Sequence, residues 1–323
     1  MSHAHVSVAV SRPSLPGDAF DRLWAVGTVQ AWTEDRTPTV TELAGVACEA
    51  EVLVCLNGDP ITAELLERCP RLKLVALASV GFNSVDIEAA GDRGIAVTNT
   101  PGVLHEATAD LAFGLILAAR RRIVEADRFV RDGRWSANSL DLMVGHDVYG
   151  AQLGIVGYGE IGRAVARRAH GFGMTVRHYS RTRRDDAVST WVEFDDLLAG
   201  SDVVSLHAPL TETTRGLIGE RELQLMRSSA TLVNTARGDL IDEPALVRAL
   251  AERWIHSAAL DVQCLEPNPD AHSPLLQFGN CVVLPHIGSA SVTARAAQVR
   301  TAVDNVLAYL TGRPLLTQVN RSA

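Results

Sequence analysis

Short apolar runs alternate along the chain with longer stretches in which apolar residues recur at helical spacing. Within the first hundred residues this pattern predicts strands at 6–10, 50–56, 72–79 and 95–100, and helices at 17–26, 39–47, 61–68 and 84–92. Strands that alternate with helices are typical of a parallel sheet with helices packed on its faces. The first third of the chain is therefore predicted to be an α/β unit.

The middle of the chain opens with one long predicted helix, from about Leu104 to Arg131. Its interior, ATADLAFGLILAARRR, is apolar almost all round before it turns basic, which indicates a largely buried helix. A stretch without clear periodicity then runs to about Gly150. Loops of this length are commonly functional or contact a partner subunit, and Trp135 suits a pocket wall as well as a subunit contact.

A second series of strands and helices begins with QLGIVGYG at 152–159. Further strands are predicted at 175–180, 202–208, 230–236, 257–262 and 281–286, with helical stretches between them. The final helix follows Ser291 and is predicted to end near Gly312, because glycine favours the position just after a helix. The pattern thus predicts an α/β fold throughout.

The segment GYGEIG (157–162) matches the G-x-G-x-x-G pattern of dinucleotide-binding domains. It follows the predicted strand LGIV and begins the helix IGRAVARRAHGFG, a context that makes the pattern informative. Gly157 would allow the tight turn, Gly159 would let the backbone approach a pyrophosphate, and Gly162 would let helix and strand pack closely. Because the helix N-terminus also offers N–H groups to an anion, the sequence predicts dinucleotide binding.

The stretch HYSRTRR (178–184) bears on the choice of cofactor. The strand before it ends at Ser180, which lies 180 − 157 = 23 residues after Gly157. An acidic residue near this position binds the ribose hydroxyls of NAD and repels a 2′-phosphate. Ser180 cannot repel that phosphate and the arginines after it can pair with it, so NADP(H) is the predicted cofactor, with NAD possible. Alternatively, the arginines form a solvated turn with Asp185 and Asp186 as partners.

Composition narrows the class of protein. A net charge of −8 argues against nucleic acid as a partner, because phosphate binding requires a basic surface. No apolar run approaches the ~18 residues that cross a bilayer, so no membrane association is expected. The N-terminus shows no secretory signal, which predicts a cytoplasmic location. The five cysteines show no metal-ligand spacing, and no metal is expected.

Three segments at the predicted ends of the later strands carry candidate chemistry: NTARGDLIDE (234–243), ALDVQCLEP (259–267) and LPHIGSAS (284–291). In an open α/β sheet the ligand site lies outside the carboxyl ends of the strands. Arg237 can hold a carboxylate and polarise an adjacent carbonyl. His286 can give or take a proton, and Glu266 next to it would favour the imidazolium and orient the ring.

These segments, the glycine-rich fingerprint and ASVGFNSVD (78–86) resemble the D-isomer-specific 2-hydroxyacid dehydrogenase family over essentially the full chain, with NADPH-dependent glyoxylate/hydroxypyruvate reductases as the closest branch. The resemblance implies two doubly wound parallel-sheet domains, a Rossmann cofactor domain inserted into a flavodoxin-like substrate domain. We expect the substrate-binding domain at 1–100 and 288–323 and the dinucleotide-binding domain at 101–287. A homodimer is also implied, with the long helix and the loop after it as the contact.

The resemblance further implies that NADPH is used to reduce a short 2-oxo acid, glyoxylate or hydroxypyruvate, to the D-2-hydroxy acid. Arg237 would orient the substrate, His286 would be the general acid/base, and Glu266 would be its partner. The substrate would be bound by the backbone of Val80 and Gly81 together with Arg237 and His286. The implied cofactor contacts are Thr108, Gly157, Tyr158, Gly159, Glu160, Ile161, Ser180, Arg181, Thr182, His207, Ala208, Pro209, Ala236, Asp261, His286 and Gly288.

The chain departs from the family pattern at one point. Gln263 and Cys264 stand where the family commonly has Phe-Glu, which puts the local packing in doubt. The following Glu266 and Pro267 are intact. Formate dehydrogenases resemble this chain but lack that acid, since formate oxidation releases no hydroxyl proton. Retention of Glu266 therefore favours hydroxyacid chemistry.

Two alternative functions fit the same sequence. The first is an NAD-dependent or dual-specificity reductase of a bulkier 2-oxo acid such as 2-ketogluconate. The second is a dinucleotide-sensing binding protein on the same scaffold, against which the complete set of Arg237, Glu266 and His286 argues.

Overall fold

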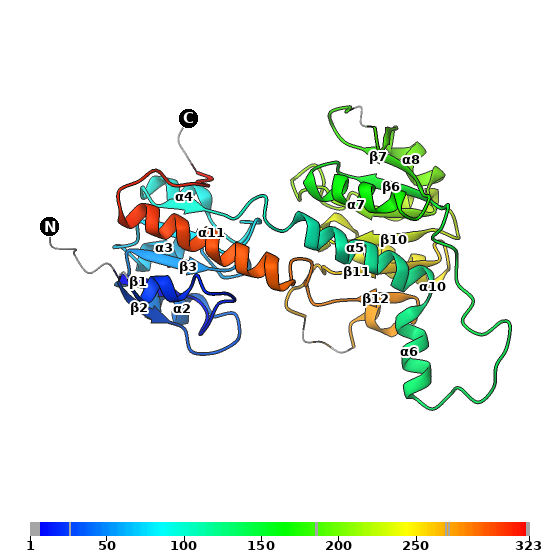
Figure 1. Ribbon diagram of the computed structural model, residues 1–323, viewed down its shortest axis with the longest axis horizontal. Coiled ribbons are helices and arrows are strands. Elements are labelled where there is room, and N and C mark those ends of the chain that lie inside the picture. The colour runs from blue at the N-terminus through cyan, green and yellow to red at the C-terminus, as the bar shows by residue number, and fades with distance from the viewer. Residues whose placement is uncertain (1–6, 26, 185–186, 269, 271, 321–323) are drawn as a thin grey trace. The chain divides into compact units, whose positions relative to one another are not determined.

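The computed structural model describes residues 7–320 except 26, 185, 186, 269 and 271. The chain divides into two compact units, one made of Met1–Leu104 with Ala290–Ala323 and the other of His105–Ser289 (Figure 1). Each unit contains one fully parallel sheet. The predicted α/β fold class with two parallel-sheet units is confirmed.

The first unit is built on a five-stranded sheet in the order β2-β1-β3-β4-β5, the order of flavodoxin-like folds. Its elements are β1 (Ser7–Val10), α1 (Asp21–Trp24), β2 (Thr28–Ala31), α2 (Val40–Ala47), β3 (Val52–Cys55), α3 (Ala63–Arg68), β4 (Leu74–Leu77), α4 (Ile87–Asp92), β5 (Ala96–Thr98) and α11 (Val292–Leu310). Strands β3 and β4, VLVC and LVAL, are buried at every position, as expected for central strands covered on both faces.

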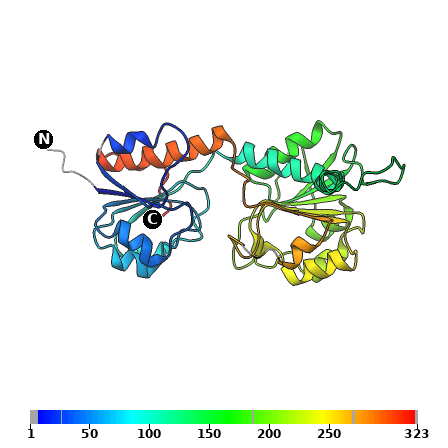
Figure 2. The ribbon, with the colours of Figure 1, turned by 90° about the horizontal axis from the view of Figure 1, so that it is seen from below.

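Two hydrophobic clusters lie on opposite faces of this sheet. Alternate residues separate them: Leu53 packs in the cluster with Leu43 and Leu65, whereas Val52 packs in the cluster with Leu23 and Val303. Helix α11 therefore covers the same face as α1, and α2 and α3 cover the other (Figure 2). This two-sided burial explains why a segment from the end of the sequence is part of the first unit.

The second unit contains a seven-stranded sheet in the order β12-β11-β10-β9-β6-β7-β8, with the order reversing at β6. Its strands are β6 (Gln152–Val156), β7 (Thr175–Tyr179), β8 (Thr190–Trp191), β9 (Val203–Leu206), β10 (Thr231–Asn234), β11 (Ser257–Leu260) and β12 (Cys281–Val283). Its α-helices are α5 (His105–Arg120), α6 (Ile123–Arg131), α7 (Glu160–His170), α8 (Phe194–Gly200), α9 (Glu220–Leu225) and α10 (Glu243–Ala251). This is the Rossmann order, in which ligands bind where the strand order reverses.

The prediction of one continuous helix from Leu104 to Arg131 is wrong, because the chain breaks between α5 and α6. Arg122 takes a left-handed conformation with φ of 53° and donates to both carboxylate oxygens of Glu125. Arg120, only 4% exposed, turns inward and donates to the carbonyls of Asp147 and Asp202. The basic run therefore ends the buried helix, and α6 continues with no buried residue.

Two short strands differ from the prediction. The short edge strands β2 and β8 were not predicted, because each has few apolar residues and lies at the edge of its sheet. Within the described part of the chain, no helix is long and apolar enough to cross a membrane.

Candidate active site

The three predicted catalytic residues follow adjacent strands of the second sheet. Arg237 comes after β10, Glu266 after β11 and His286 after β12, and these strands are neighbours in the sheet. Because the strands are parallel, the segments that carry these residues begin at the same edge. The edge is the carboxyl end of the sheet, where α/β proteins bind their ligands.

Glu266 and His286 form a hydrogen-bonded pair. The Glu266 Oε2 atom lies 2.6 Å from His286 Nδ1, and its Oε1 atom accepts from the Gln263 N–H at 2.6 Å. The two side chains are 31% and 41% exposed, so ligands can reach the ring. His286 Nε2 has no hydrogen-bond partner in the described part of the chain, which makes it the nitrogen able to donate a proton to a bound substrate.

Asp261 holds the backbone around His286. His286 has φ of 55°, an uncommon conformation for a residue with a side chain, and its N–H donates to the Asp261 carbonyl at 2.9 Å. The Asp261 carboxylate accepts from the N–H groups of Ile287 and Gly288 at 2.8 and 2.6 Å. Burial raises the pKa of the Asp261 carboxyl, and these two donors oppose the rise. Asp261, which was predicted as a cofactor contact, thus also stabilises the turn that carries the His286 imidazole.

Arg237 is positioned by Asn234, a fully buried residue that the sequence analysis did not single out. The Asn234 side chain accepts from the Ala236 N–H at 2.9 Å and donates to the Arg237 carbonyl at 2.8 Å. The Arg237 Nη1 donates to the Ala236 carbonyl at 2.6 Å. Burial lowers the pKa of the Arg237 guanidinium from its ordinary value, and the charge of Glu266 opposes this effect.

Gly238 explains how the loop after β10 packs against the segment that carries Glu266. A Cβ atom at this position would overlap the backbone of Gln263 and Cys264. The side chain of Gln263 accepts from Asn268 Nδ2 at 3.1 Å, so the departure from the family pattern is accommodated by a local hydrogen bond. The backbone at 263 still donates to Glu266, and the carboxylate keeps its place.

The glycines of the fingerprint have distinct surroundings. Gly157 has φ of 93°, and a Cβ there would lie 2.5 Å from the Ala208 nitrogen. A Cβ at Gly162 would overlap the Gly157 carbonyl. A Cβ at Gly159, in contrast, would meet no atom within 4 Å, and α7 begins directly after it. This open helix N-terminus fits a pyrophosphate, whereas the other two glycines are required by the packing of the protein itself.

Three further predicted cofactor contacts, Tyr158, His207 and Thr108, have different surroundings. The Tyr158 side chain, 3% exposed, stacks on His178 with 3.8 Å between ring centroids, so only its backbone remains to contact a ligand. His207 contacts Ser205 Oγ at 2.9 Å, and burial lowers its pKa to about 4, which keeps the imidazole neutral. Thr108, in α5, is buried beside Gly288.

The loop after β7 is exposed from Arg181 to Arg184. Ser180 Oγ donates to the Thr182 carbonyl at 2.8 Å, and Trp191 Nε1 donates to the Ser180 carbonyl at 3.1 Å. The Arg183 guanidinium lies 5.4 Å from the Trp191 ring centroid. Trp191 was not predicted to take part, yet it supports the loop. Asp185 and Asp186, the alternative partners of these arginines, lie outside the described residues.

In the first unit, Val80 and Gly81 lie in the loop after β4, at the carboxyl end of that sheet. Asn99 Nδ2 donates to the Val80 carbonyl at 2.9 Å, and Ser79 Oγ donates to the Gly81 carbonyl at 2.8 Å. Among the described residues, the N–H groups of Val80 and Gly81 have no hydrogen-bond partner. Asn99, which the sequence indicates only as a turn residue, thus fixes a loop whose Val80 and Gly81 N–H groups could bind an anion.

The described residues contain no group of three or more His, Cys, Asp or Glu side chains able to hold a metal ion. Burial raises the thiol pKa of both Cys264 and Cys281 to about 12, so neither supplies a thiolate nucleophile near neutral pH. Among the described residues at the edge of the second sheet, the guanidinium of Arg237, the imidazole of His286 and the carboxylate of Glu266 remain the candidates for the chemistry.

Comparison with known proteins identifies the family. The sequence model of the protein family described as "D-isomer specific 2-hydroxyacid dehydrogenase, NAD binding domain" matches residues 113–288. A glyoxylate reductase from Thermococcus litoralis is 45% identical over 301 residues, which span 91% of this chain and 90% of that protein. The chain belongs to the D-isomer-specific 2-hydroxyacid dehydrogenase family. The resemblance inferred from the motifs is confirmed, and the chain is an NAD(P)-dependent dehydrogenase.

Solved structures of similar proteins agree with this assignment to the 2-hydroxyacid dehydrogenases. A protein from Thermus thermophilus is 44% identical, with a TM-score of 0.92 over 97% of this chain and 100% of that one. An NADPH-dependent glyoxylate/hydroxypyruvate reductase from Sinorhizobium meliloti, in complex with NADP and malonate, is 30% identical, with a TM-score of 0.86 over 99% and 100% of the two chains. A nicotinamide dinucleotide is therefore the cofactor.

Proposed function

We propose that this dehydrogenase reduces a short 2-oxo acid, glyoxylate or hydroxypyruvate, to the D-2-hydroxy acid with NADPH. The observation that carries the proposal is the pair of Glu266 and His286, with 2.6 Å between Oε2 and Nδ1, following a strand adjacent to the one that presents Arg237. A carboxylate-supported imidazole is required to protonate an oxygen but not to oxidise formate. The names of relatives at 45% and 30% identity point to the same substrates.

Each residue has a distinct role in the proposed reaction. The bound nicotinamide supplies the hydride that the C2 carbon of the acid receives. Arg237 holds the substrate and polarises its carbonyl, and His286 Nε2 donates a proton to the oxygen at C2. Glu266 keeps the imidazole oriented through the contact between Oε2 and Nδ1. The Val80 and Gly81 N–H groups donate hydrogen bonds to the substrate carboxylate.

The second unit is proposed to bind the dinucleotide and the first unit to receive the substrate. The open N-terminus of α7 at Gly159 suits the pyrophosphate. The proposed cofactor contacts are those predicted from the sequence: Thr108, Gly157, Tyr158, Gly159, Glu160, Ile161, Ser180, Arg181, Thr182, His207, Ala208, Pro209, Ala236, Asp261, His286 and Gly288. In Tyr158 the contact comes from the backbone, since the ring is buried.

NADPH is proposed as the preferred cofactor because the loop after β7 offers exposed arginines and no acid at Ser180. The S. meliloti relative was solved with NADP, which supports this choice. Arg181 is the side chain proposed to pair with the 2′-phosphate.

A homodimer is proposed from the surface of the second unit. Helix α6 has no buried residue, and the chain between it and β6 exposes large apolar side chains. Trp135 is 58% exposed and Leu140 fully so. Such a patch is typical of a protein–protein contact, and a second copy would cover it.

Initial rates test the proposed function. NADPH and NADH oxidation should be measured with glyoxylate, hydroxypyruvate, pyruvate and 2-ketogluconate, for the wild type and for Arg181→Ala. We expect the highest kcat/KM with NADPH and one of the first two acids, and a loss of roughly tenfold to 100-fold in the NADPH preference in the variant. Arg167→Ala, which removes an exposed charge from α7, should keep the preference.

Other outcomes would each correct a part of the proposal. Equal use of NADH would assign the arginines to a solvated turn. Highest activity with 2-ketogluconate would replace the proposed substrate by a bulkier acid. An inactive protein that still binds NADPH would favour a dinucleotide-sensing function.

A further inference from the structure

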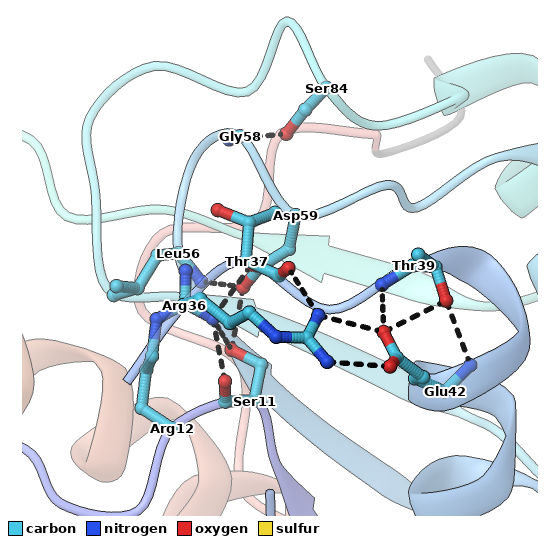
Figure 3. Close-up of polar contacts among 10 residues, drawn as sticks. All are labelled: Ser11, Arg12, Arg36, Thr37, Thr39, Glu42, Leu56, Gly58, Asp59 and Ser84. Atoms are coloured by element: carbon cyan, nitrogen blue, oxygen red, sulfur yellow. Dashed lines mark hydrogen bonds and ion pairs between the residues drawn. The ribbon is translucent and has the colours of Figure 1, made fainter. Parts of the chain in front are cut away.

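A buried carboxylate in the first unit has no part in the chemistry described so far. Asp59 is fully buried just after β3 (Figure 3). Its Oδ2 accepts from Ser11 Oγ at 2.5 Å and from the Leu56 N–H at 2.8 Å, and its Oδ1 accepts from Arg12 Nη1 at 2.8 Å. The Arg12 side chain is 12% exposed. A carboxylate is retained in such a place only when several donors compensate its lost hydration.

The cluster of Ser11, Arg12, Leu56 and Asp59 joins the ends of two neighbouring strands. Ser11 and Arg12 directly follow β1, while Leu56 and Asp59 follow β3, and β1 pairs with β3. All four residues therefore lie at the carboxyl end of the first sheet. The Asp59 carboxylate fixes the turn after β3 by holding the N–H at its start.

The turn after β3 is in turn connected to the loop after β4. The Gly58 N–H donates to Ser84 Oγ at 3.0 Å, as Figure 3 shows, and Gly58 has φ of 101°, which favours glycine. The Ile61 N–H donates to the Ser84 carbonyl at 3.1 Å. Ser84 thus accepts two hydrogen bonds from the chain that follows β3, one at its hydroxyl from Gly58 and one at its carbonyl from Ile61.

The loop that Ser84 ends is the loop that begins with Ser79 and contains Val80 and Gly81. The Val80 carbonyl accepts a hydrogen bond from Asn99 Nδ2, and the Gly81 carbonyl accepts one from Ser79 Oγ. The N–H groups of Val80 and Gly81 have no partner in the described part of the chain. An anion-binding site made of backbone N–H groups has no side chain that can reorient toward the ligand. Its geometry depends on how firmly the loop is held at both ends.

We propose that Asp59 and Ser84 are positioning residues of the substrate site. The Asp59 carboxylate fixes the turn after β3, and the Ser84 hydroxyl couples that turn to the loop that presents the Val80 and Gly81 N–H groups. The inference rests on the proposed function, since it assigns those N–H groups to the carboxylate of the 2-oxo acid. Neither residue takes part in proton transfer.

The first test is Ser84→Ala, which removes the hydroxyl that accepts from Gly58. One lost hydrogen bond corresponds to a change of roughly fivefold, so KM for glyoxylate should rise roughly threefold to tenfold. The kcat and the KM for NADPH should stay within about twofold, because the second unit is unchanged. The inhibition constant of oxalate, a two-carbon dianion that accepts no hydride, should rise in parallel, and Ser84→Thr should restore both values.

The second test separates positioning from stability. In the double variant Arg12→Met/Asp59→Leu, apolar residues replace the ion pair, a change that often leaves stability nearly intact. The Leu56 N–H nevertheless loses its acceptor, so KM for glyoxylate should rise even where the melting temperature is preserved. Glu42→Gln is the matched control: it weakens the exposed network of Arg36, Thr39 and Glu42 in the same unit (Figure 3) and should leave KM unchanged.

The outcomes distinguish the inference from the function on which it rests. A wild type that reduces no 2-oxo acid overturns the proposed function and this inference with it. An active wild type whose KM and oxalate inhibition are unchanged in both Ser84→Ala and the double variant overturns the inference alone. A fall in kcat equal to the rise in KM would also overturn it, because the residues would then act on the chemical step.

Discussion

The two units each place a carboxylate at the carboxyl end of a parallel sheet, and the two local arrangements are alike. Asp59 accepts from the N–H of Leu56, and Glu266 accepts from the N–H of Gln263, in both cases three residues earlier. Each carboxylate also forms a hydrogen bond with a basic side chain, Asp59 with Arg12 and Glu266 with His286.

The two pairs differ in exposure and in the kind of partner. The Asp59 side chain is fully buried and that of its partner Arg12 is only 12% exposed, so the pair is enclosed by the protein. Glu266 and His286 are 31% and 41% exposed, and the partner is an imidazole, whose two ring nitrogens can each donate or accept a hydrogen bond. Under the proposed function, the same local backbone arrangement supports a loop in one unit and holds the proton donor in the other.

The largest expected effect comes from removing the titratable partner. His286→Asn keeps a side chain that can bond to Glu266 but cannot donate a proton in the same way. We expect kcat for glyoxylate reduction to fall by about a thousandfold, within the range of general acid catalysis, while the melting temperature changes little. A variant that retains a tenth of the activity would contradict the role of His286 as proton donor.

Removing the charge from the exposed carboxylate should have a smaller effect. Glu266→Gln keeps an acceptor for the Gln263 N–H but replaces the carboxylate that contacts His286 Nδ1 by a neutral amide. We expect kcat to fall roughly tenfold to 100-fold, because the neutral amide orients and supports the imidazole less well than the carboxylate. The kcat for glyoxylate reduction is the measurement, and an unchanged value would contradict the role of Glu266.

The glycines of the second unit distinguish a ligand contact from internal packing. In Gly159→Ala the new Cβ meets no protein atom, so unfolding should be unchanged, while KM for NADPH should rise by about tenfold or more. In Gly162→Ala the Cβ overlaps the Gly157 carbonyl, and the free energy of unfolding should drop by about 1–3 kcal/mol. Denaturant unfolding without cofactor, together with cofactor titration, checks both. The reverse ranking would remove the anion site from α7.

The smallest expected effect concerns His207, a second histidine, which we expect to influence the pH dependence of stability. Burial lowers the pKa of His207 from 6.5 to about 4, so the unfolded chain binds more protons than the folded one between these pH values. Stability from this residue is present above pH 6.5 and is lost as the pH falls toward 4, with a slope of up to about 1.4 kcal/mol per pH unit. His207→Asn should flatten this slope. Equal slopes in the wild type and the variant would contradict the burial argument.

Much of this structure follows from local patterns in the sequence. Buried strands such as VLVC and LVAL are continuous apolar runs, and the fingerprint at 157–162 carries its strand and helix with it. Arg237, Glu266 and His286 could be proposed because each follows an apolar run in a recognisable motif. Strand ends of a parallel sheet meet at one edge, so the spacing alone brings these residues to the same edge.

Other features could not be predicted, because they depend on contacts distant in the sequence. Asp59 resembles a turn residue until Arg12, 47 residues earlier, is placed beside it. Arg120 looked like part of a basic helix surface, and only the carbonyls of Asp147 and Asp202 explain why it turns inward and the helix stops. Asn234 and Asn99 likewise act through backbone groups that no local pattern identifies.

The most direct test of the central claim is the product that the wild type forms from hydroxypyruvate. Stopped reactions should be analysed for NADPH consumed and for the configuration of the glycerate formed. The account predicts one D-glycerate for each NADPH oxidised. Formation of L-glycerate, or no NADPH oxidation with either hydroxypyruvate or glyoxylate, would contradict it.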